Sequence, residues 1–343
     1  MTDLDVRMSA PAPGAFARAR RQGIAAMGGR RVLFIIPVLA VVSAAVFAAA
    51  AHSPFDPLVG YLGTRYLTTS EADKTAIADQ LGFTKPWYET YGSWVHGVLA
   101  GDLGISRSFN QPVAQVISER LPWTLLLVTV GLGAAIIFSL LLGVWAGMQR
   151  GSWLDRLVAA VCLVVQGLPP FVLALTAIVF FSLGMGWFPV AGLTDGGADP
   201  TVGQVSRHLI LPAGVLAISQ MPWLLLAVRE SVASARGEDF VAGALARGVD
   251  VRTITRRHIV PTSLAPFVTI IGVRLPEIIV GAVLVEEVFS WPGIAGALVE
   301  SARNLDMALL ALLTVGTVVA VMLGSLLADI AYALLDPRVS TDG

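Results

Sequence analysis

The stretch LPWTLLLVTVGLGAAIIFSLLLGVWAGMQ, from Leu121 to Gln149, contains no charged residue. A helix needs about 20 apolar residues to cross a hydrocarbon core of about 30 Å, so this stretch is long enough to span a membrane. Five further runs have the same character, although Arg274 and Glu277 interrupt the fifth in chain order. The six runs are residues 32–51, 121–149, 157–183, 209–228, 259–285 and 307–328. The sequence therefore predicts an all-α integral membrane protein with six transmembrane helices.

The composition also indicates a membrane protein. Of the 343 residues, 55% are hydrophobic and 14% are charged, whereas roughly a quarter of the residues of a soluble domain are charged. A formal net charge of −1 provides no concentrated basic surface, so we expect no nucleic-acid partner. The single cysteine, Cys162, can form neither an intrachain disulfide nor a cysteine-rich metal site.

The distribution of basic residues predicts the topology, because short cytoplasmic loops collect Arg and Lys. With the N-terminus inside, the segments 1–31, 150–156, 229–258 and the C-terminal tail hold 15 of the 23 basic residues. We therefore expect both termini in the cytoplasm. The first run could instead be a cleaved signal peptide, since arginines precede it and small residues end it. Its length of about 20 residues favours a membrane span.

The runs and the segments between them suggest five parts of the chain. Residues 1–29 are rich in Ala, Pro, Gly and Arg without apolar periodicity, which predicts disorder. The predicted parts are a disordered cytoplasmic tail at 1–29, a first transmembrane helix at 30–51, an extracytoplasmic cap segment at 52–120, a five-helix core at 121–335 with a cytoplasmic loop at 229–261, and a cytoplasmic tail at 336–343. A Gly-Leu-Pro-Pro break at residues 167–170 reflects ordinary packing or a cavity beside the third span.

Motifs of nucleotide-hydrolysing and metal-dependent enzymes are missing from the sequence. A phosphate-binding loop needs Gly-Lys followed by Ser or Thr, whereas the two lysines, Lys74 and Lys85, follow Asp and Thr. The four histidines show no His-Glu-x-x-His spacing, and no Gly-x-Ser-x-Gly sequence occurs. We therefore expect this chain to have no catalytic residues, no bound cofactor and no metal site.

The loop between the fourth and fifth runs predicts a short helix at residues 238–248. Glu238 and Asp239 would lie at its positive N-terminal end, Arg247 at its negative C-terminal end, and Gly248 would supply a left-handed final residue. Small residues on this helix predict a surface with few protruding side chains, which the groove of another protein can approach closely. These residues are Ala242, Gly243, Ala244 and Ala246. From these residues alone, a connecting helix at the membrane surface and a docking element fit equally well.

This loop resembles the coupling motif of ABC importer permeases, in which a Glu-Ala-Ala triplet precedes a glycine and, thirteen residues later, a proline. Gly248 and Pro261 have this spacing, although Ala242-Gly243 replaces the Glu-Ala pair. The resemblance implies an ATPase-coupling site at Glu238, Asp239, Phe240, Ala242, Gly243, Ala244, Arg247, Gly248, His258 and Pro261.

Further motifs resemble the B-type subunits of the dipeptide, oligopeptide and nickel branch of this family. Taken alone, the Trp-Pro-Gly sequence could be an interfacial turn with a tryptophan anchor, but the joint order of the motifs is specific. The signature residues are Gly101, Asp102, Phe289, Trp291, Pro292, Gly293, Asp336 and Pro337.

The resemblance implies a type I ABC importer permease fold and a subunit that forms half of a translocation pathway in a bacterial cytoplasmic membrane. The implied partners are a homologous C-type permease, two ATP-binding cassette ATPases, an extracytoplasmic solute-binding protein and the lipid bilayer. ATP and magnesium would bind to the ATPases. The expected solutes are di- or oligopeptides, with nickel chelates, glutathione and siderophores as alternatives. A stand-alone ion-coupled transporter is the rival, but the paired inverted halves expected for it are not visible.

Three acidic or basic residues are candidates for the translocation pathway. A charge within a membrane span is costly and usually forms a pair or faces a pathway. Arg274 and Glu277 would share one face of a helix. They form either an internal ion pair or a cavity site, in which Arg274 meets a solute carboxylate and Glu277 an amine or cation. Glu286 matches an acidic position of the related permeases, and we expect it near the outer end, in the pathway or solvated.

Overall fold

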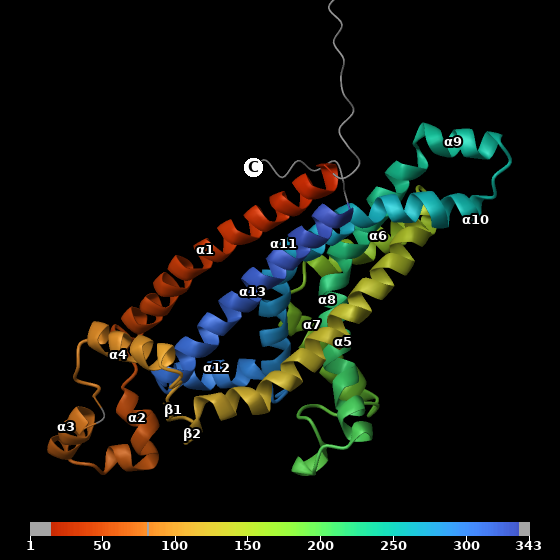
Figure 1. Cartoon of the computed structure of the whole chain (residues 1–343). Coiled ribbons are helices and arrows are strands. Elements are labelled where there is room, and N and C mark those ends of the chain that lie inside the picture. The colour runs from red at the N-terminus through yellow and green to blue at the C-terminus, as the bar shows by residue number, and fades with distance from the viewer. Residues whose placement is uncertain (1–14, 81, 336–343) are drawn as a thin grey trace, which may run out of the picture.

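The computed structural model describes residues 15–80 and 82–335, which form a bundle of helices (Figure 1). The α-helices are α1 (Ala15–Ala51), α2 (Pro57–Leu62), α3 (Glu71–Gln80), α4 (Trp87–Leu99), α5 (Val113–Met148), α6 (Trp153–Gln166), α7 (Pro170–Ala177), α8 (Val202–Arg236), α9 (Asp239–Ala246), α10 (Val251–Ile254), α11 (Val260–Val288), α12 (Ile294–Arg303) and α13 (Met307–Leu335). Tighter or wider helical turns are η1 (Gly63–Leu67), η2 (Ile178–Gly184), η3 (Asp195–Gly197) and η4 (Thr255–Ile259). Strands β1 (Ile105–Ser106) and β2 (Gln111–Pro112) form a small antiparallel hairpin, with Ile105 opposite Pro112.

Four of these helices are long and apolar enough to cross a membrane. Their candidate spans are Leu33–Ala51 in α1, Val113–Met148 in α5, Val202–Arg236 in α8 and Met307–Ile330 in α13. The third and fifth predicted spans are bent. The angle is 103° between α6 and Pro170–Gly184, and 57° between Val251–Arg274 and Pro276–Val288. Proline lacks the N–H that a helix interior needs, which places both bends at prolines. Within the described residues, the bundle therefore has four spans, or up to six when each bent pair counts as one.

Two predicted boundaries differ from the structure. Residues 15–29, expected to be disordered, form the first part of α1; their alanines favour a helix even without an apolar face. The expected cap segment ends at residue 120, whereas α5 already begins at Val113, directly after Pro112. The absence of charge identifies the part of a helix that can enter a membrane, but the helix itself extends beyond it. The predicted tails at 1–14 and 336–343 lie outside the described residues.

The centre of the bundle is a close contact between α5 and α8. Small, buried residues lie on one face of α5 at four-residue intervals: Gly131, Ala135, Ser139, Gly143 and Gly147. A Cβ atom added at Gly143 would lie 2.8 Å from the Val228 side chain, and one at Gly147 would lie 2.7 Å from the Arg229 carbonyl oxygen. These distances leave no room for a side chain, so the two backbones approach as in other small-residue helix interfaces in membranes.

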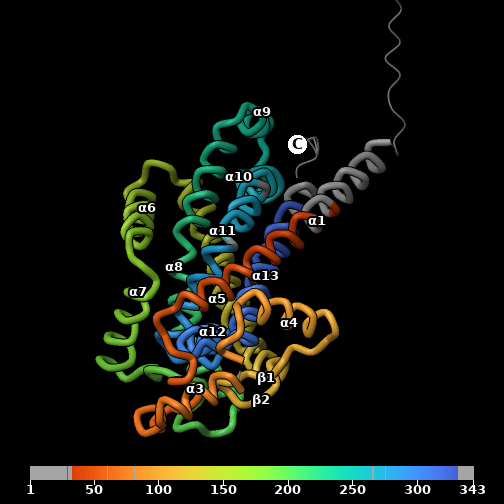
Figure 2. The backbone as a smooth tube through the Cα atoms, turned by 90° about the vertical axis from the view of Figure 1, so that its left-hand side faces the viewer, coloured from red at the N-terminus to blue at the C-terminus, as the bar shows by residue number. Residues whose placement is uncertain are grey.

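The two ends of the bundle carry different structures (Figures 1 and 2). At one end, which we call the α9 end, α9 projects beyond the long helices; the first turns of α1 and the last turns of α13 lie at the same end in Figure 1. At the other end lie α12, the loop between η2 and α8, and residues 52–112, which we call the cap segment. Both views show the cap segment folded against one side of the bundle.

The cap segment is attached to the first and last long helices. Phe47 of α1 packs against Tyr91 and Trp94 of α4, with ring centroids 5.4 Å and 5.6 Å apart. Asp306, which precedes α13, is 1% exposed. It accepts hydrogen bonds from the Ser106 hydroxyl, at 2.5 Å, and from the backbone N–H of Ser108, at 3.0 Å. The cap segment therefore joins elements from the two ends of the chain.

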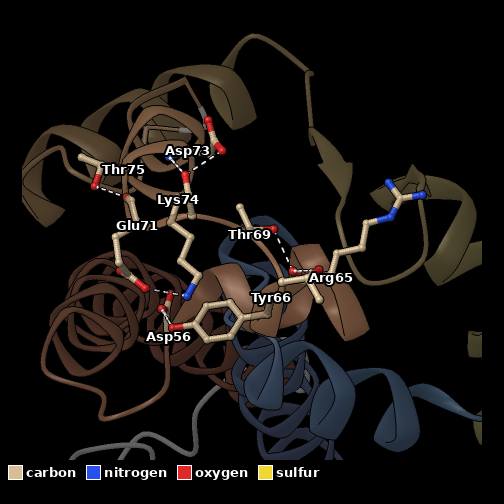
Figure 3. Close-up of polar contacts among 10 residues, drawn as sticks. Asp56, Arg65, Tyr66, Thr69, Glu71, Asp73, Lys74 and Thr75 are labelled. Atoms are coloured by element: carbon tan, nitrogen blue, oxygen red, sulfur yellow. Dashed lines mark hydrogen bonds and ion pairs between the residues drawn. The ribbon is translucent and has the colours of Figure 1, made fainter.

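Exposed polar contacts order the turn between α2 and α3 (Figure 3). The Tyr66 hydroxyl donates a hydrogen bond to Asp56 at 2.7 Å, and Lys74 Nζ donates to Glu71 at 2.8 Å. The ammonium group also lies 4.1 Å from the centroid of the Tyr66 ring. The bond to Asp56 raises the pKa of Tyr66, and the bond to Glu71 raises the pKa of Lys74. Both groups therefore keep their protons at neutral pH.

The contact between α5 and α8 predicts a position-dependent effect of filling glycines. Gly143→Leu should lower the free energy of unfolding by about 1–3 kcal/mol, because the new side chain must displace Val228. Gly133→Leu is the matched control, since a Cβ there meets no described atom within 4 Å. Thermal unfolding in detergent, followed by tryptophan fluorescence, measures both. Equal stability of the two variants would contradict the close contact.

Candidate functional site

Helix α9 forms in the loop where the sequence predicts a short helix, and its end is well defined. The acidic Glu238 and Asp239 lie at its start. At its end, the Val249 N–H donates to the Ala244 carbonyl at 3.1 Å and the Gly248 N–H to the Leu245 carbonyl at 2.9 Å. Gly248 has a φ of +76°, which a residue with a side chain rarely adopts. This pattern is a Schellman motif, so the predicted glycine stop is confirmed.

One face of α9 is anchored to the bundle and the other is exposed. Val241 and Ala244 are buried in an apolar cluster with residues of α8, α10 and α11. The expectation that Ala244 belongs to the outer surface is therefore wrong, because the helix turns that residue towards the bundle. Phe240 and Leu245 are 41% and 48% exposed. Around these two side chains the outer surface consists of further exposed residues: Ala242, Gly243, Ala246 and Arg247.

The other predicted residues of the coupling site lie beside α9. His258, in η4, is exposed, and its ring centroid lies 6.2 Å from that of Phe240. Pro261 is in the first turn of α11, directly after the wider turn η4, and the backbone is helical across this junction. The thirteen-residue spacing from Gly248 therefore connects the end of α9 to the start of the long helix α11.

A buried ion pair fixes the base of α8 near α9. Arg229 donates two hydrogen bonds to Asp155, at 2.5 Å from Nε and 2.9 Å from a terminal nitrogen. Asp155 is 1% exposed and also accepts the Gly151 N–H at 2.9 Å. This two-point contact joins the start of α6 to α8. The sequence prediction did not single out this pair, although each member is a charge at the end of an apolar run.

A pocket with a cavity volume of about 460 Å³ lies where the α6–α7 break and the bend of α11 face α8. Its lining comes from the break between α6 and α7, from α8 around Pro222, and from α11 around Pro276. Irregular backbone at membrane depth is tolerated where it is covered by protein or lines a cavity. We call this cavity the helix-break pocket. Its location indicates that the break in the third run reflects a cavity as well as packing.

Arg274 and Glu277 lie in the wall of the helix-break pocket and also contact each other. Arg274 donates a hydrogen bond to the Glu277 carboxylate, as their shared helix face predicts. The guanidinium lies 4.0 Å from the centroid of the Trp223 ring, in a cation–π contact. The predicted ion pair is therefore formed, and both residues also line the pocket. Together the pair contributes no net charge to the pocket.

Glu286 has a different role from the one expected. It is 1% exposed rather than solvated, and its carboxylate accepts the Ala295 N–H at 2.9 Å in the first turn of α12. A Cβ on Gly293 would overlap this carboxylate, so only glycine fits there. The chain folds back over Glu286 after α11, which buries it under the Trp-Pro-Gly turn. Glu286 therefore fixes the start of α12 and is not in the helix-break pocket.

The remaining signature residues also hold the fold together. Trp291 is 2% exposed and donates from Nε1 to the Trp123 carbonyl at 3.0 Å, so it is not a lipid-facing anchor. Phe289 is 1% exposed. Gly101 ends α4 with a φ of +86°, and the Asp102 carboxylate accepts the Gly104 N–H at 2.9 Å. The last signature residues, Asp336 and Pro337, lie outside the described residues.

The described residues thus form a bundle of long apolar helices, in which broken or bent helices line a pocket and a short capped helix projects at one end. Residues 139–341 match the family model of the binding-protein-dependent transport system inner membrane component. The chain belongs to this family, the permease subunits of ABC importers. It is a multi-pass membrane protein and a transport subunit rather than a catalytic enzyme. Among the described residues, no group of three or more His, Cys, Asp or Glu is placed to hold a metal ion.

Curated relatives match the chain over nearly its whole length. It is 32% identical to the oligopeptide transport system permease protein AppB of Bacillus subtilis, over 90% of this chain and 98% of that protein. It is 30% identical to a putative peptide permease of Brucella suis, over 90% and 97%. The glutathione transport system permease protein GsiC of Escherichia coli is also 30% identical, over 90% and 97%. The resemblance carried by the loop and signature motifs is therefore confirmed.

The ion pair at the base of α8 predicts an asymmetry between single and double variants. Asp155→Asn should lower the free energy of unfolding by about 3 kcal/mol, because it leaves the largely buried Arg229 charge with only a 3.8 Å contact to the exposed Glu230. Asp155→Asn with Arg229→Gln should recover part of this loss, since no unpaired charge remains. Glu230→Gln is the control: it removes the exposed partner of the same Arg229, at 3.8 Å, and because its side chain is 58% exposed we expect a change below about 1 kcal/mol. A loss of unfolding free energy in the double variant that exceeds the summed losses of the two single variants would argue against the pair.

Proposed function

We propose that this chain is the transmembrane permease subunit of an ATP-driven importer and forms half of a translocation pathway for di- or oligopeptides. Helix α9 carries this proposal. It is short, ends in a Schellman motif and is anchored on one face by Val241 and Ala244. Phe240 and Leu245 are partly exposed on either side of that face, and the outward face carries the small residues Ala242, Gly243 and Ala246. An anchored helix with this low-relief outer surface suits docking into the groove of a separate protein. The family's dependence on separate subunits supports a docking role over a mere connecting helix.

The α9 end would face the cytoplasm of a bacterial cell, and the cap segment would lie outside. The arginine-rich loop around α9 supports this orientation. The first turns of α1 and the last turns of α13 lie at the same end (Figure 1), which supports two cytoplasmic termini and six spans, each bent pair counting as one. In this orientation a solute-binding protein meets the cap end, and two ATPases, which hold ATP and magnesium, meet the α9 end.

A homologous second permease would complete the pathway, as the resemblance to ABC importer permeases implies. The proposed mechanism is mechanical. ATP binding closes the two ATPases, the docked helices move with them, and the bundles re-orient around the pocket. Each α9 must therefore be rigid, which its Schellman end and buried Val241 and Ala244 provide.

Peptides are the proposed solute because the relatives are named as oligopeptide, peptide and glutathione permeases. The helix-break pocket supports a neutral polar solute, since its one basic and one acidic residue neutralise each other. Nickel chelates, glutathione and siderophores are alternatives that the same machinery would carry. Family membership argues against a stand-alone ion-coupled transporter.

Gly248→Leu tests the docking role of α9. A side chain at a φ of +76° costs about 1–2 kcal/mol and distorts the end of α9. We expect ATP-dependent uptake of a peptide by the assembled transporter to fall more than tenfold, while the chain still reaches the membrane. Uptake in proteoliposomes and co-purification of the ATPases measure the two parts of this prediction.

Gly151→Leu is the matched control, because Gly151 has a φ of +87° in the turn between α5 and α6, outside α9. This variant should carry the same backbone strain and retain uptake. Normal uptake by Gly248→Leu, or equal losses in both variants, would count against coupling through α9.

A further inference from the structure

Two polar atoms in the wall of the helix-break pocket have no hydrogen-bond partner among the described residues. One is the side-chain oxygen of Gln220, an acceptor, and the other is Nε of Arg274, a donor. Gln220 is only 5% exposed. A buried polar group without a partner costs about 1–3 kcal/mol, so such groups usually have a use. Here an unused acceptor and an unused donor line the same cavity.

The surroundings of Gln220 fix which end of its amide is unused. Ser219 donates its hydroxyl hydrogen to the Leu216 carbonyl at 2.8 Å, so the Ser219 oxygen is left as an acceptor. The Gln220 amide nitrogen donates to that oxygen at 3.3 Å. A Cβ at Gly281 would lie 3.1 Å from the same nitrogen, so glycine there leaves room for the amide. The Gln220 oxygen is therefore the free acceptor.

The charges around these atoms favour a neutral ligand. The Arg274 guanidinium is already balanced by Glu277 and packed on Trp223. A metal cation would need several ligand oxygens, nitrogens or thiolates, and an anion would compete with Glu277 for Arg274. A peptide group instead offers one N–H donor and one carbonyl acceptor, without charge. Its N–H matches the unused acceptor of Gln220, and its carbonyl matches the unused donor of Arg274.

We propose that Gln220 and Arg274 form a subsite that binds the backbone peptide group of the solute as it passes through the helix-break pocket. This inference rests on the proposed peptide transport. Both atoms are covered in the present conformation, so the contact forms when the bundle opens at the α6–α7 break and at Pro276. Gln220 accepts the N–H of the peptide group, and Arg274 donates to its carbonyl oxygen. The subsite recognises the backbone, which all peptides share, and does not select among their side chains.

Ester analogues test this subsite, because an ester keeps the carbonyl and lacks the N–H. The transporter, assembled from this chain, its partner permease, the ATPases and the receptor, is reconstituted in proteoliposomes. Uptake of trialanine and of its analogue with both peptide bonds replaced by esters is measured at saturating receptor. In Gln220→Leu the ratio of the trialanine rate to the ester rate should fall about threefold to tenfold, which is the contribution of one neutral hydrogen bond. Gly281→Ala should lower the ratio in the same direction, since its methyl group displaces the Gln220 amide.

Gln204→Leu is the matched control. It makes the same change at another buried, unpartnered glutamine oxygen on α8, outside the helix-break pocket, and should leave the ratio unchanged. If the ratio stays at the wild-type value in Gln220→Leu and Gly281→Ala, or if both rates fall by one factor, the subsite is wrong while the proposed function stands. If the wild-type transporter carries neither compound with ATP present, the proposed function fails, and this inference fails with it.

Discussion

The close contact between α5 and α8 is the constraint on which the rest of the structure depends. In a membrane, helices gain little from hiding apolar surface, so tight backbone approach has to supply much of the packing energy. The small residues of α5 permit that approach along the length of α8. Helix α8 is accordingly the most buried of the long spans, whereas α1 and α13 lie at the periphery of the chain.

Because α8 is held so firmly, it can carry the features that matter for transport. Its end leads through Gly237 into α9, and near this end Arg229 is fixed to Asp155. Pro222 lies about 21 Å from the end of α8 at Arg236, at a rise of 1.5 Å per residue. Its neighbours on α8 line part of the helix-break pocket. A docking helix and a pocket on one rigid rod provide the physical link that the proposed mechanism needs. The bends at Pro170 and Pro276 supply places where the neighbours of this rod can change direction.

The sequence predicts the parts of this protein that depend on local chemistry. The run from Leu121 to Gln149 indicates a span because length and apolarity decide that property alone, and Gly248 indicates a helix end because few other residues adopt its conformation. Contacts between distant segments escape this reasoning. Glu286 looks solvated beside the Trp-Pro-Gly turn, but it is buried because α12 folds back over it. The four-residue repeat of small residues on α5 is a signal that could have identified the α8 contact.

The helix-break pocket also shows why an ion pair can persist inside a membrane. Charges there are costly, and Arg274 meets that cost through Glu277 and the Trp223 ring, beside a cavity rather than facing lipid. A net charge in the pocket would favour solutes of one sign and repel the others. A neutralised pair leaves hydrogen bonding as the means of recognition, and the peptide group is the hydrogen-bonding unit common to peptides of every side-chain composition. A pathway built in this way would delegate the choice among peptides to the solute-binding protein and need only recognise the backbone itself.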